Sequence, residues 1–549
     1  MLDVTRRAWC LVLVLFSCDT GALFGVGDSP AERGLGTQGG YRDPATLIVG
    51  RDADADLLDP ARATHQESVE VAMQIFDRLV DLQPGQSEPE PALAVSWELA
   101  DDGRTRIFEL RRGVRFHDGT PFNADAVVLS FERQRDAAHP YHRDDFFYWK
   151  YYFGNVVAVE KVDDYRVRIE LLHQYGPFLA NMSIFSMSVV SPTSFVKRGD
   201  AVEFRPIGTG PFKFESFVDG RLVLERNDDY WGDAPKFSQL VFQTIDDPRQ
   251  RMTALVSGDI DVVLNMAPED RQFVQLHPRL RLHTTMENAV TYLAMNTQRP
   301  PFDDVRVRRA INMAINKEPV VRVLWHGSAK PAHTPVPPSL WGHYTVPEPY
   351  RYDPAAARRL LDQAAQDGGL DPQATYTLYV NSTPRQYLPH PSRLARAVQA
   401  NLDDVGLAVE IVLQDKDAHD RSLSGGEYDL CIDGWVGDTG DPDNFLYLLL
   451  SGDNAEPTGE NPPGNVARFV DPVLDAALIL AQESLDPDER ARHYKLVQSL
   501  IHEQAPWVPI AHTSMGLAAR SDIVDVRTGV SGLLQYQYVA RRGRTGAGR

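Results

Sequence analysis

Strand-like and helix-like segments alternate along almost the whole sequence, and this alternation limits the fold more than any other feature. Short runs typical of strands occupy residues 46–50, 104–110 and 221–226, while residues 124–135 and 305–314 have helical spacing. Helices repeat apolar residues every three or four positions, whereas half-buried strands alternate apolar and polar residues. Proteins that interleave the two patterns are of the α/β or the mixed α+β type. We expect the α/β class.

Several local elements are predicted closely. The runs 156–162 and 165–171 flank the turn residues Asp163 and Asp164, which predicts a β-hairpin. Asn123 is expected to cap the helix at 124–135, because its side chain can accept a backbone N–H. The other expected elements are helices at 69–79, 249–257, 392–405, 471–484 and 487–504, and strands at 240–244, 378–380 and 409–412.

Length and charge narrow the class of protein. A chain of 549 residues is long enough for three or four compact units of about 150 residues each. Hydrophobic residues make up 43% and charged residues 24%, which excludes a disordered chain and a polytopic membrane protein. The net charge is −20, from 56 Lys and Arg against 76 Asp and Glu. This acidic excess argues against nucleic acid or an anionic membrane surface as the main partner.

The first residues have the pattern of an export signal. Two arginines precede an apolar run at residues 8–16, which is too short for a bilayer span of about 20 residues but suits a signal-peptide core. Ser17 and Cys18 end this run and resemble the lipobox of bacterial lipoproteins. We expect a signal peptide at 1–17 and lipidation of Cys18. A plain secretory signal cut a few residues later, or a misassigned start, are the alternatives.

The segments beside the folded part carry no periodic pattern. Residues 18–44 are rich in glycine and are expected to form a flexible tether, and the basic tail at 541–549 is expected to be disordered. Of the three cysteines, only Cys431 lies beyond the signal segment. The mature chain is therefore expected to have no intramolecular disulfide.

Sequence motifs of common enzymes are missing. The chain has no GxxxxGK[ST], no GxGxxG after a strand, no HExxH and no GxSxG. Asp438-Thr439-Gly440 resembles an aspartic-protease motif, but the second copy that a dyad requires lies at 19–21, in the expected tether. Asp52, Asp54 and Asp56 imitate a calcium loop without its turn glycine and its final glutamate. We therefore expect no catalytic residue, no metal site and no cofactor.

Five segments, in order along the chain, resemble the family 5 solute-binding proteins, which are the peptide and nickel receptors of bacterial ABC importers. They are PALAVSWELADDGRTRIFELRRGVRFHDGTPF (91–122), KVDDYRVRIEL (161–171), PIGTGPFKFESF (206–217), LAMNTQRPPFDDVRVRRAINMAINKE (293–318) and GWVGDTGDPDNF (434–445). The resemblance extends over about 45–525, and the last segment is most similar to the dipeptide-binding branch. It implies a two-lobed periplasmic-binding-protein fold of the large peptide-binding type, with a two-segment hinge.

This resemblance also implies an order of domains. The first lobe is expected at 45–290 with an inserted subdomain, the second lobe at 291–506, and a return segment at 507–540 that completes the first lobe. The two crossings between lobes are expected near Met295 and Pro506. The aromatic run at 146–153 is interpreted as the core of the inserted subdomain rather than as a wall of the ligand site.

A receptor for short peptides must recognise the two charged ends of a zwitterion. Aspartate suits the ammonium group, and arginine binds a carboxylate through two parallel hydrogen bonds. The resemblance implies that Asp438 binds the amine and that Arg385, in the Arg-x-Tyr-x-Pro segment 385–389, binds the carboxylate. Gly434, Trp435 and Tyr387 are implied to line the same site.

Structural roles for these residues stay open. Arg385 could be a surface charge beside a turn, and Asp438 could cap a helix that begins near Pro442. Trp435 and Tyr387 could belong to the core. The segment at 50–54 is charged where dipeptide-binding members have small polar residues, so the contribution of the first lobe and the length of the peptide are open.

The expected function is the extracytoplasmic substrate-binding component of an ABC importer. It would capture short peptides, with dipeptides favoured, by their charged ends and deliver them to the permease subunits. It would work as a monomer in the periplasm or at the cell surface, held to the membrane by its lipid anchor and binding no nucleic acid. The alternatives are a receptor of the same family for glutathione, haem, a nickel chelate or an oligosaccharide, and, from another class, a secreted hydrolase.

Overall fold

The computed structural model describes residues 43–82, 86, 88–199, 201–285, 288–457, 462–529 and 531–542. The expected signal peptide, Cys18, nearly all of the tether and the end of the tail lie outside these residues. The chain divides into two units, Met1–Asp43 and Pro44–Arg549. Within the described residues, no helix has the length and apolar character that a membrane crossing requires.

A seven-stranded sheet forms the centre of the first lobe. Its strand order is β10-β11-β12-β1-β13-β21-β14. The strands are β1 (Thr46–Arg51), β10 (Phe212–Val218), β11 (Arg221–Arg226), β12 (Gln239–Thr244), β13 (Val262–Val263), β14 (Leu280–Thr284) and β21 (Gly516–Arg520). The central strand β1 pairs in parallel with both β12 and β13, and the outer pairs are antiparallel. Helices α1 (Gln66–Ile75) and α5 (Pro248–Ser257) contribute to separate hydrophobic clusters, which contain Val49 and Val263 respectively.

The helix expected at 69–79 is shorter at its C-terminal end. Helix α1 stops at Ile75, and Phe76 takes extended backbone angles of −121° and 144°. The next residue explains the stop, because the Asp77 carboxylate accepts hydrogen bonds from Trp231 Nε1 at 2.8 Å, Thr209 Oγ1 at 2.9 Å and Tyr230 OH at 3.2 Å. These hydrogen bonds hold the chain away from the helix axis. The helix predicted for residues 76–79 was therefore wrong.

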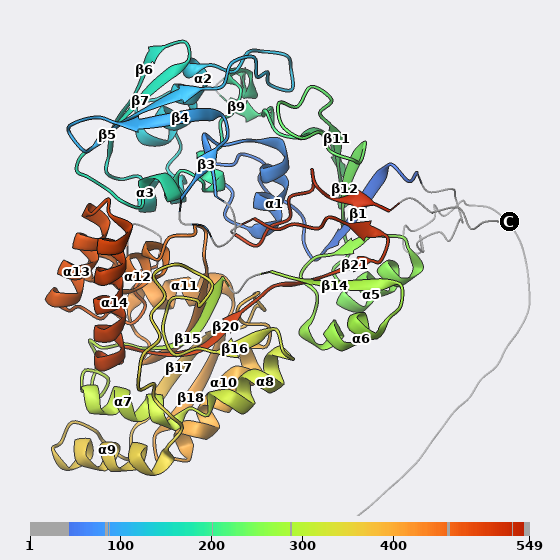
Figure 1. Ribbon diagram of the computed structural model, residues 1–549. Coiled ribbons are helices and arrows are strands. Elements are labelled where there is room, and N and C mark those ends of the chain that lie inside the picture. The colour runs from blue at the N-terminus through green and yellow to red at the C-terminus, as the bar shows by residue number, and fades with distance from the viewer. Residues whose placement is uncertain are drawn as a thin grey trace, which may run out of the picture. The chain divides into compact units, whose positions relative to one another are not determined.

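The inserted subdomain is built on a four-stranded sheet of order β4-β5-β7-β6. Its strands are β4 (Ala94–Leu99), β5 (Thr105–Leu110), β6 (Val156–Asp163) and β7 (Arg166–Leu171), and α2 (Ala124–Arg135) packs beside β6 and β7 (Figure 1). The predicted hairpin is confirmed as β6–β7. The predicted cap is also confirmed, because the Asn123 side chain accepts the backbone N–H of Ala126. The short helix α3 (Phe147–Tyr152) lies between α2 and β6 in the sequence.

A six-stranded sheet forms the second lobe. Its order is β16-β20-β15-β19-β17-β18. The strands are β15 (Ala289–Met295), β16 (Ala329–Pro331), β17 (Thr375–Asn381), β18 (Ala408–Gln414), β19 (Leu430–Val436) and β20 (Trp507–Thr513). One hydrophobic cluster joins the sheet to α7 (Val305–Ala314), α8 (Lys317–Trp325), α9 (Pro354–Gln366) and α10 (Pro391–Asp403). Another includes α12 (Asp443–Leu450), α13 (Pro472–Glu483) and α14 (Pro487–Gln504).

The chain crosses between the two large sheets twice, and the crossings lie side by side. It passes from β14 to β15 and returns from β20 to β21. Thr284 is paired with Gly516 in the first sheet, and Ala289 is paired with Thr513 in the second. Between them, the backbone N–H of Thr285 donates to the carbonyl of Met515 at 3.0 Å. Up to Thr285 and again from Ala289, the two passing segments therefore form a two-stranded antiparallel ribbon.

The expected crossings near Met295 and Pro506 are displaced from this ribbon. The predicted boundary at 290/291 falls inside β15, and the return segment begins with β20 instead of after it. Strands β15 and β20 pair with each other from Ala289–Thr513 to Ala294–Trp507, so both belong wholly to the second sheet. The two-lobed fold of the α/β class is retained, with crossings at 284–289 and 513–516.

A buried ion pair fixes the loop that follows β19. Arg490 of α14 donates through both terminal nitrogens to the two oxygens of Asp441, each at 2.8 Å. The side chains are 7% and 2% exposed, and the Tyr494 hydroxyl donates to the same carboxylate at 3.2 Å. A fully hydrogen-bonded pair of this kind resists disruption, because removing one partner leaves the other charge buried.

We predict that Asp441→Asn lowers the free energy of unfolding by about 3–5 kcal/mol, since Arg490 would keep an uncompensated buried charge. Glu203→Gln is the matched control, because the Arg198–Glu203 pair is exposed on both sides and solvent screens it, so its loss should hardly change the stability. Urea unfolding followed by circular dichroism measures both variants. Equal midpoints for the two variants would contradict the structural role assigned to Asp441.

Candidate functional site

The topology of the second sheet places two predicted site residues at one edge. Strands β17 and β19 are parallel neighbours, with Leu378 opposite Leu430 and Val380 opposite Ile432. Arg385 follows the carboxyl end of β17, and Asp438 follows the carboxyl end of β19. Ligands of open α/β sheets bind outside the carboxyl ends of the strands. The fold therefore brings these two residues, far apart in the sequence, to the same edge of the sheet.

The turn that carries Arg385 is fixed to the sheet by Tyr387. Arg385 and Leu388 exchange backbone hydrogen bonds of 3.0 and 2.9 Å. The carbonyl of Tyr387 accepts a hydrogen bond from the Thr291 hydroxyl of β15, and its phenol donates to Asp433 of β19 at 3.3 Å. The Arg385 side chain is half-buried, and none of the ion pairs or side-chain hydrogen bonds of the described residues involves its guanidinium. The turn thus places the positively charged guanidinium of Arg385 at the sheet edge.

Gly434 makes room for the Tyr387 ring. A Cβ atom at this position would overlap Tyr387 Cδ2 and would lie 2.6 Å from the carbonyl oxygen of Val290. The next residue back, Asp433, accepts the Tyr387 hydrogen bond in a buried setting that raises the pKa of its carboxyl. The contact between Gly434 and Tyr387 therefore holds the turn that carries Arg385 against β19.

Asp438 is joined to the inserted subdomain through Tyr152. The Tyr152 hydroxyl donates to Asp438 Oδ2 at 3.2 Å and accepts from Asn444 Nδ2 at 2.7 Å. Asn444 Oδ1 accepts the backbone N–H of Asp438 at 3.0 Å and the Trp435 indole N–H at 3.0 Å. Asn444 thus connects both predicted residues of the β19 loop to a tyrosine of the other lobe.

The alternative role of Asp438 as a helix cap does not fit this geometry. Helix α12 begins after Pro442, with no side-chain capping hydrogen bond. The Asp438 carboxylate points instead to Tyr152, and it also accepts from Tyr148. Trp435 likewise uses its polar atom in this network, so neither residue is explained by local structure alone.

Asp438 has an unusual electrostatic setting. Burial raises the pKa of Asp438 to about 7, although the hydrogen bonds from Tyr152, Asn444 and Tyr148 favour the carboxylate. The side chain still keeps part of its surface accessible. A desolvated carboxylate with only neutral donors around it has no counter-charge. A bound cationic group would supply one.

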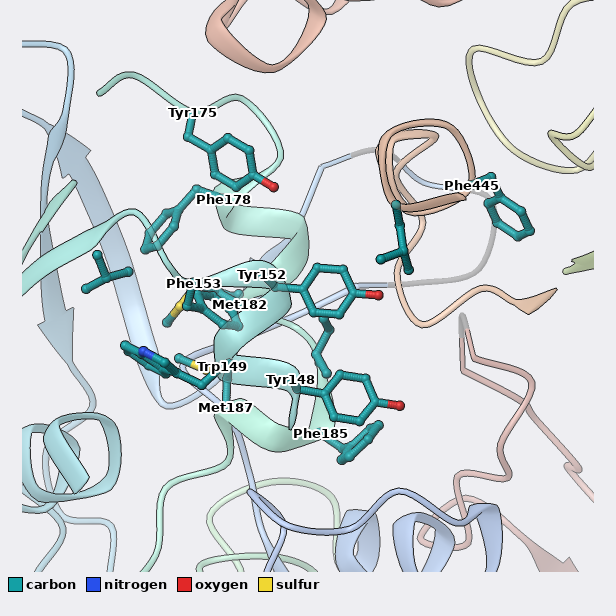
Figure 2. Packing of buried hydrophobic residues seen from close by; sticks show 14 of the residues in the cluster. Tyr148, Trp149, Tyr152, Phe153, Tyr175, Phe178, Met182, Phe185, Met187 and Phe445 are labelled. Carbon is teal, nitrogen blue, oxygen red and sulfur yellow. The ribbon is translucent and has the colours of Figure 1, made fainter. Parts of the chain in front are cut away.

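The aromatic run at 146–153 has two faces with different roles. Trp149 and Phe153 stack on each other at a centroid distance of 5.3 Å and belong to the buried core. Figure 2 shows the hydroxyls of Tyr148 and Tyr152 pointing in one direction, away from Trp149. They are spaced by one helical turn of α3. The interpretation of this run as core was incomplete, because its tyrosines reach Asp438.

The structure adds Tyr148, Tyr152 and Asn444 to the predicted site. The spacing of two tyrosines by four residues, which places both on one face of a helix, is a signal that could have indicated them. Asn444 gave no such signal, because an asparagine at a helix start is ordinary. Within the described part of the chain, no group of three or more His, Cys, Asp or Glu side chains is arranged to hold a metal ion.

Comparison with known proteins identifies the family. The model of the bacterial extracellular solute-binding proteins, family 5, matches residues 88–457. The chain belongs to this family. The family resemblance and the two-lobed fold expected from the sequence are confirmed.

Relatives within family 5 include several named peptide receptors. Di/tripeptide-binding protein 2 of Pseudomonas aeruginosa is 34% identical over 88% of this chain and 92% of the relative. Heme-binding protein A of Haemophilus influenzae is 35% identical over 82% of this chain and 83% of its own length. A periplasmic binding protein of Helicobacter pylori, solved with the peptide STSA, is 31% identical with a TM-score of 0.77, and the match covers 90% of this chain and 98% of that one.

We predict that Gly434→Ala lowers the free energy of unfolding by about 1–3 kcal/mol, because the added methyl group overpacks the contact between β19 and Tyr387. Gly425→Ala is the control, since its nearest contact would be an ordinary 3.7 Å to Glu427 Cγ. Chemical unfolding of both variants measures the difference. A Gly434→Ala protein as stable as the control would show that the Tyr387 turn is not held against β19.

Proposed function

We propose that this family 5 protein is the extracytoplasmic binding component of an ABC importer that captures short peptides by their charged ends. The observation that carries the proposal is the pair of opposite charges, Arg385 and Asp438, at the carboxyl edge of one sheet. The names of the relatives, di/tripeptide-binding proteins and a protein solved with a peptide, support the same ligand class.

Asp438 is proposed to bind the peptide ammonium. An ammonium carries a full charge and three donors, which match a carboxylate whose surroundings otherwise offer neutral phenol and amide donors. Tyr152 belongs to the inserted subdomain and Asp438 to the second lobe, so a ligand bound there would contact both. Ligand binding would thereby favour the conformation in which the lobes meet.

Arg385 is proposed to bind the peptide carboxylate. The guanidinium presents a planar fork that matches a carboxylate through two hydrogen bonds. The distance between the two anchors would set the length of the ligand, since each extended residue adds about 3.3–3.6 Å. Dipeptides are the favoured ligands, and recognition through backbone ends leaves the side chains free to vary.

We predict that Asp438→Asn and Arg385→Ala each cost about 2–5 kcal/mol in affinity for a free dipeptide, at least about 25-fold. Asp438→Asn should hardly change the weak binding of N-acetylated peptides, and Arg385→Ala should hardly change that of C-amidated peptides. Calorimetry on the matched ligands separates lost recognition from misfolding, because a misfolded variant loses every ligand equally. If both variants bind the free dipeptide within about threefold of the wild type, the two-anchor proposal fails.

Peptide affinity should also depend on pH through Asp438. Because the pKa of Asp438 is about 7 before an ammonium binds, the carboxyl is increasingly protonated as pH falls below 7 and must release its proton on binding. We predict that affinity falls by up to about tenfold per pH unit between about pH 7 and pH 5.5, where peptide ends keep their charges. Calorimetry in buffers of different ionisation enthalpy measures the released proton. Asp438→Asn should release none, and a wild type with equal affinity at both pH values would refute this role.

The membrane anchor is a separate proposal. Cys18 ends an apolar run and follows Ser17, which supports lipidation of a mature chain that begins at Cys18. Cys18→Ala should release the protein from membranes or stop its processing, as fractionation and immunoblotting would show. Mass spectrometry of a wild-type chain that begins beyond Cys18 and carries no acyl group would refute the anchor.

A further inference from the structure

A small cavity lies in the second lobe, lined by residues that take no part in the candidate site. It is bounded by the first residue of α8, the segment after β16, the end of α14 and the start of β20. Its polar lining comes from Asn312, Lys317, His333, Tyr350, Gln498, His502 and Trp507. Its volume of about 10 Å³ leaves room for one small bound species.

Lys317 brings a buried positive charge to this cavity. The residue is 7% exposed, and its ammonium donates a hydrogen bond to the carbonyl of Ala332 at 3.1 Å. An ammonium has three donors, and within the described residues no second acceptor is paired with it. Desolvation lowers the pKa of Lys317 to about 7. A buried charge of this kind is costly unless a counter-charge lies nearby.

Trp507 adds a second donor to the same cavity. The side chain is 2% exposed and stacks on Tyr292 with ring centroids 3.6 Å apart. Its indole N–H has no hydrogen-bond partner within the described residues. Buried polar groups are almost always paired with protein or with a bound species. The two side chains that carry these buried donors therefore line one cavity, and one of them is charged.

The other charged and titratable groups around Lys317 do not neutralise it. His333 and His502 both line the cavity, and burial lowers the pKa of each, with repulsion from Lys317 lowering it further. His502 is engaged through Nε2 with the carbonyl of Glu348 at 3.1 Å. Beyond it, Glu503 and Arg309 act on His502 in opposite directions. No acidic side chain is among the described residues that line the cavity.

We propose that this cavity binds a monatomic anion of the chloride class between Lys317 Nζ and Trp507 Nε1. A water molecule would satisfy the donors but would leave the lysine charge unbalanced, whereas an anion does both. The cavity is small, which favours a monatomic anion over sulfate or phosphate. The bound anion would join α8 to β20, the strand that leads into the return crossing.

Crystals of the full chain soaked in bromide test the site directly. An anomalous peak is expected between Lys317 Nζ and Trp507 Nε1. A density without anomalous signal would mean that the cavity holds a water only, and would overturn the proposal. This measurement does not depend on any variant or on peptide binding, so its failure and that of the proposed function are distinguishable.

Thermal unfolding provides the second test. At constant ionic strength, replacing gluconate by chloride should raise the unfolding midpoint at about pH 6, and the rise should largely disappear at about pH 9, where Lys317 is neutral. Lys317→Met should lose the chloride response. Arg322→Met, on an exposed position of the same helix, should retain it. A wild type that responds equally to the two anions at both pH values would overturn the proposal.

Discussion

The buried pair of Asp441 and Arg490 is the interaction on which the candidate site depends. The loop after β19 carries Asp438 on one side of this pair and Asp443 on the other. Asp443 accepts hydrogen bonds from Gln482 of α13 at 3.0 and 3.1 Å and from Tyr175 of the inserted subdomain at 3.3 Å. Helices α13 and α14 therefore hold the loop from within the second lobe, and the inserted subdomain contacts it from the first lobe.

This support explains how a carboxylate with a raised pKa can persist at a sheet edge. Packing and the Arg490–Asp441 pair hold the loop a few residues away, so Asp438 stays at the sheet edge although burial raises the pKa of its carboxyl. Asn444 then transmits the position of the loop to Tyr152 through two hydrogen bonds. The cation-binding role proposed for Asp438 would place the ammonium of a bound ligand within this network.

Local patterns predicted much of the fold because they depend on nearest neighbours. The cap at Asn123, the hairpin β6–β7 and the paired helices α13 and α14 follow from spacing and turn residues alone. The end of α1 could not be predicted in this way, because it depends on hydrogen bonds from Thr209, Tyr230 and Trp231 to Asp77. The crossings were misplaced for a similar reason. Strands β15 and β20 belong to the second sheet because they pair with each other, and this pairing is not visible in either local sequence.

The candidate site also combines residues that the sequence predicted and residues that only the structure reveals. Arg385, Tyr387, Gly434, Trp435 and Asp438 were inferred from a family resemblance, and the parallel pairing of β17 and β19 gives them a common edge. Their roles toward a ligand stay predictions. The contact between Tyr152 and Asn444 could not be inferred, because a contact across 292 positions of sequence has no local pattern. The cavity beside Lys317 is equally invisible in the sequence, since its donors come from separate elements.

The paired ribbon between the lobes has a consequence for the order in which the protein folds. All strands of the second sheet lie between β14 and β21 in the sequence, and the two ends of this stretch are neighbours, with Ala289 opposite Thr513. In the first sheet, β14 pairs with β21, which is made only after the whole second lobe. A chain that emerges N-terminus first can therefore complete the second lobe as a unit. At that stage the first sheet still lacks β21, one of its inner strands. The lobe that begins first is the one that finishes last.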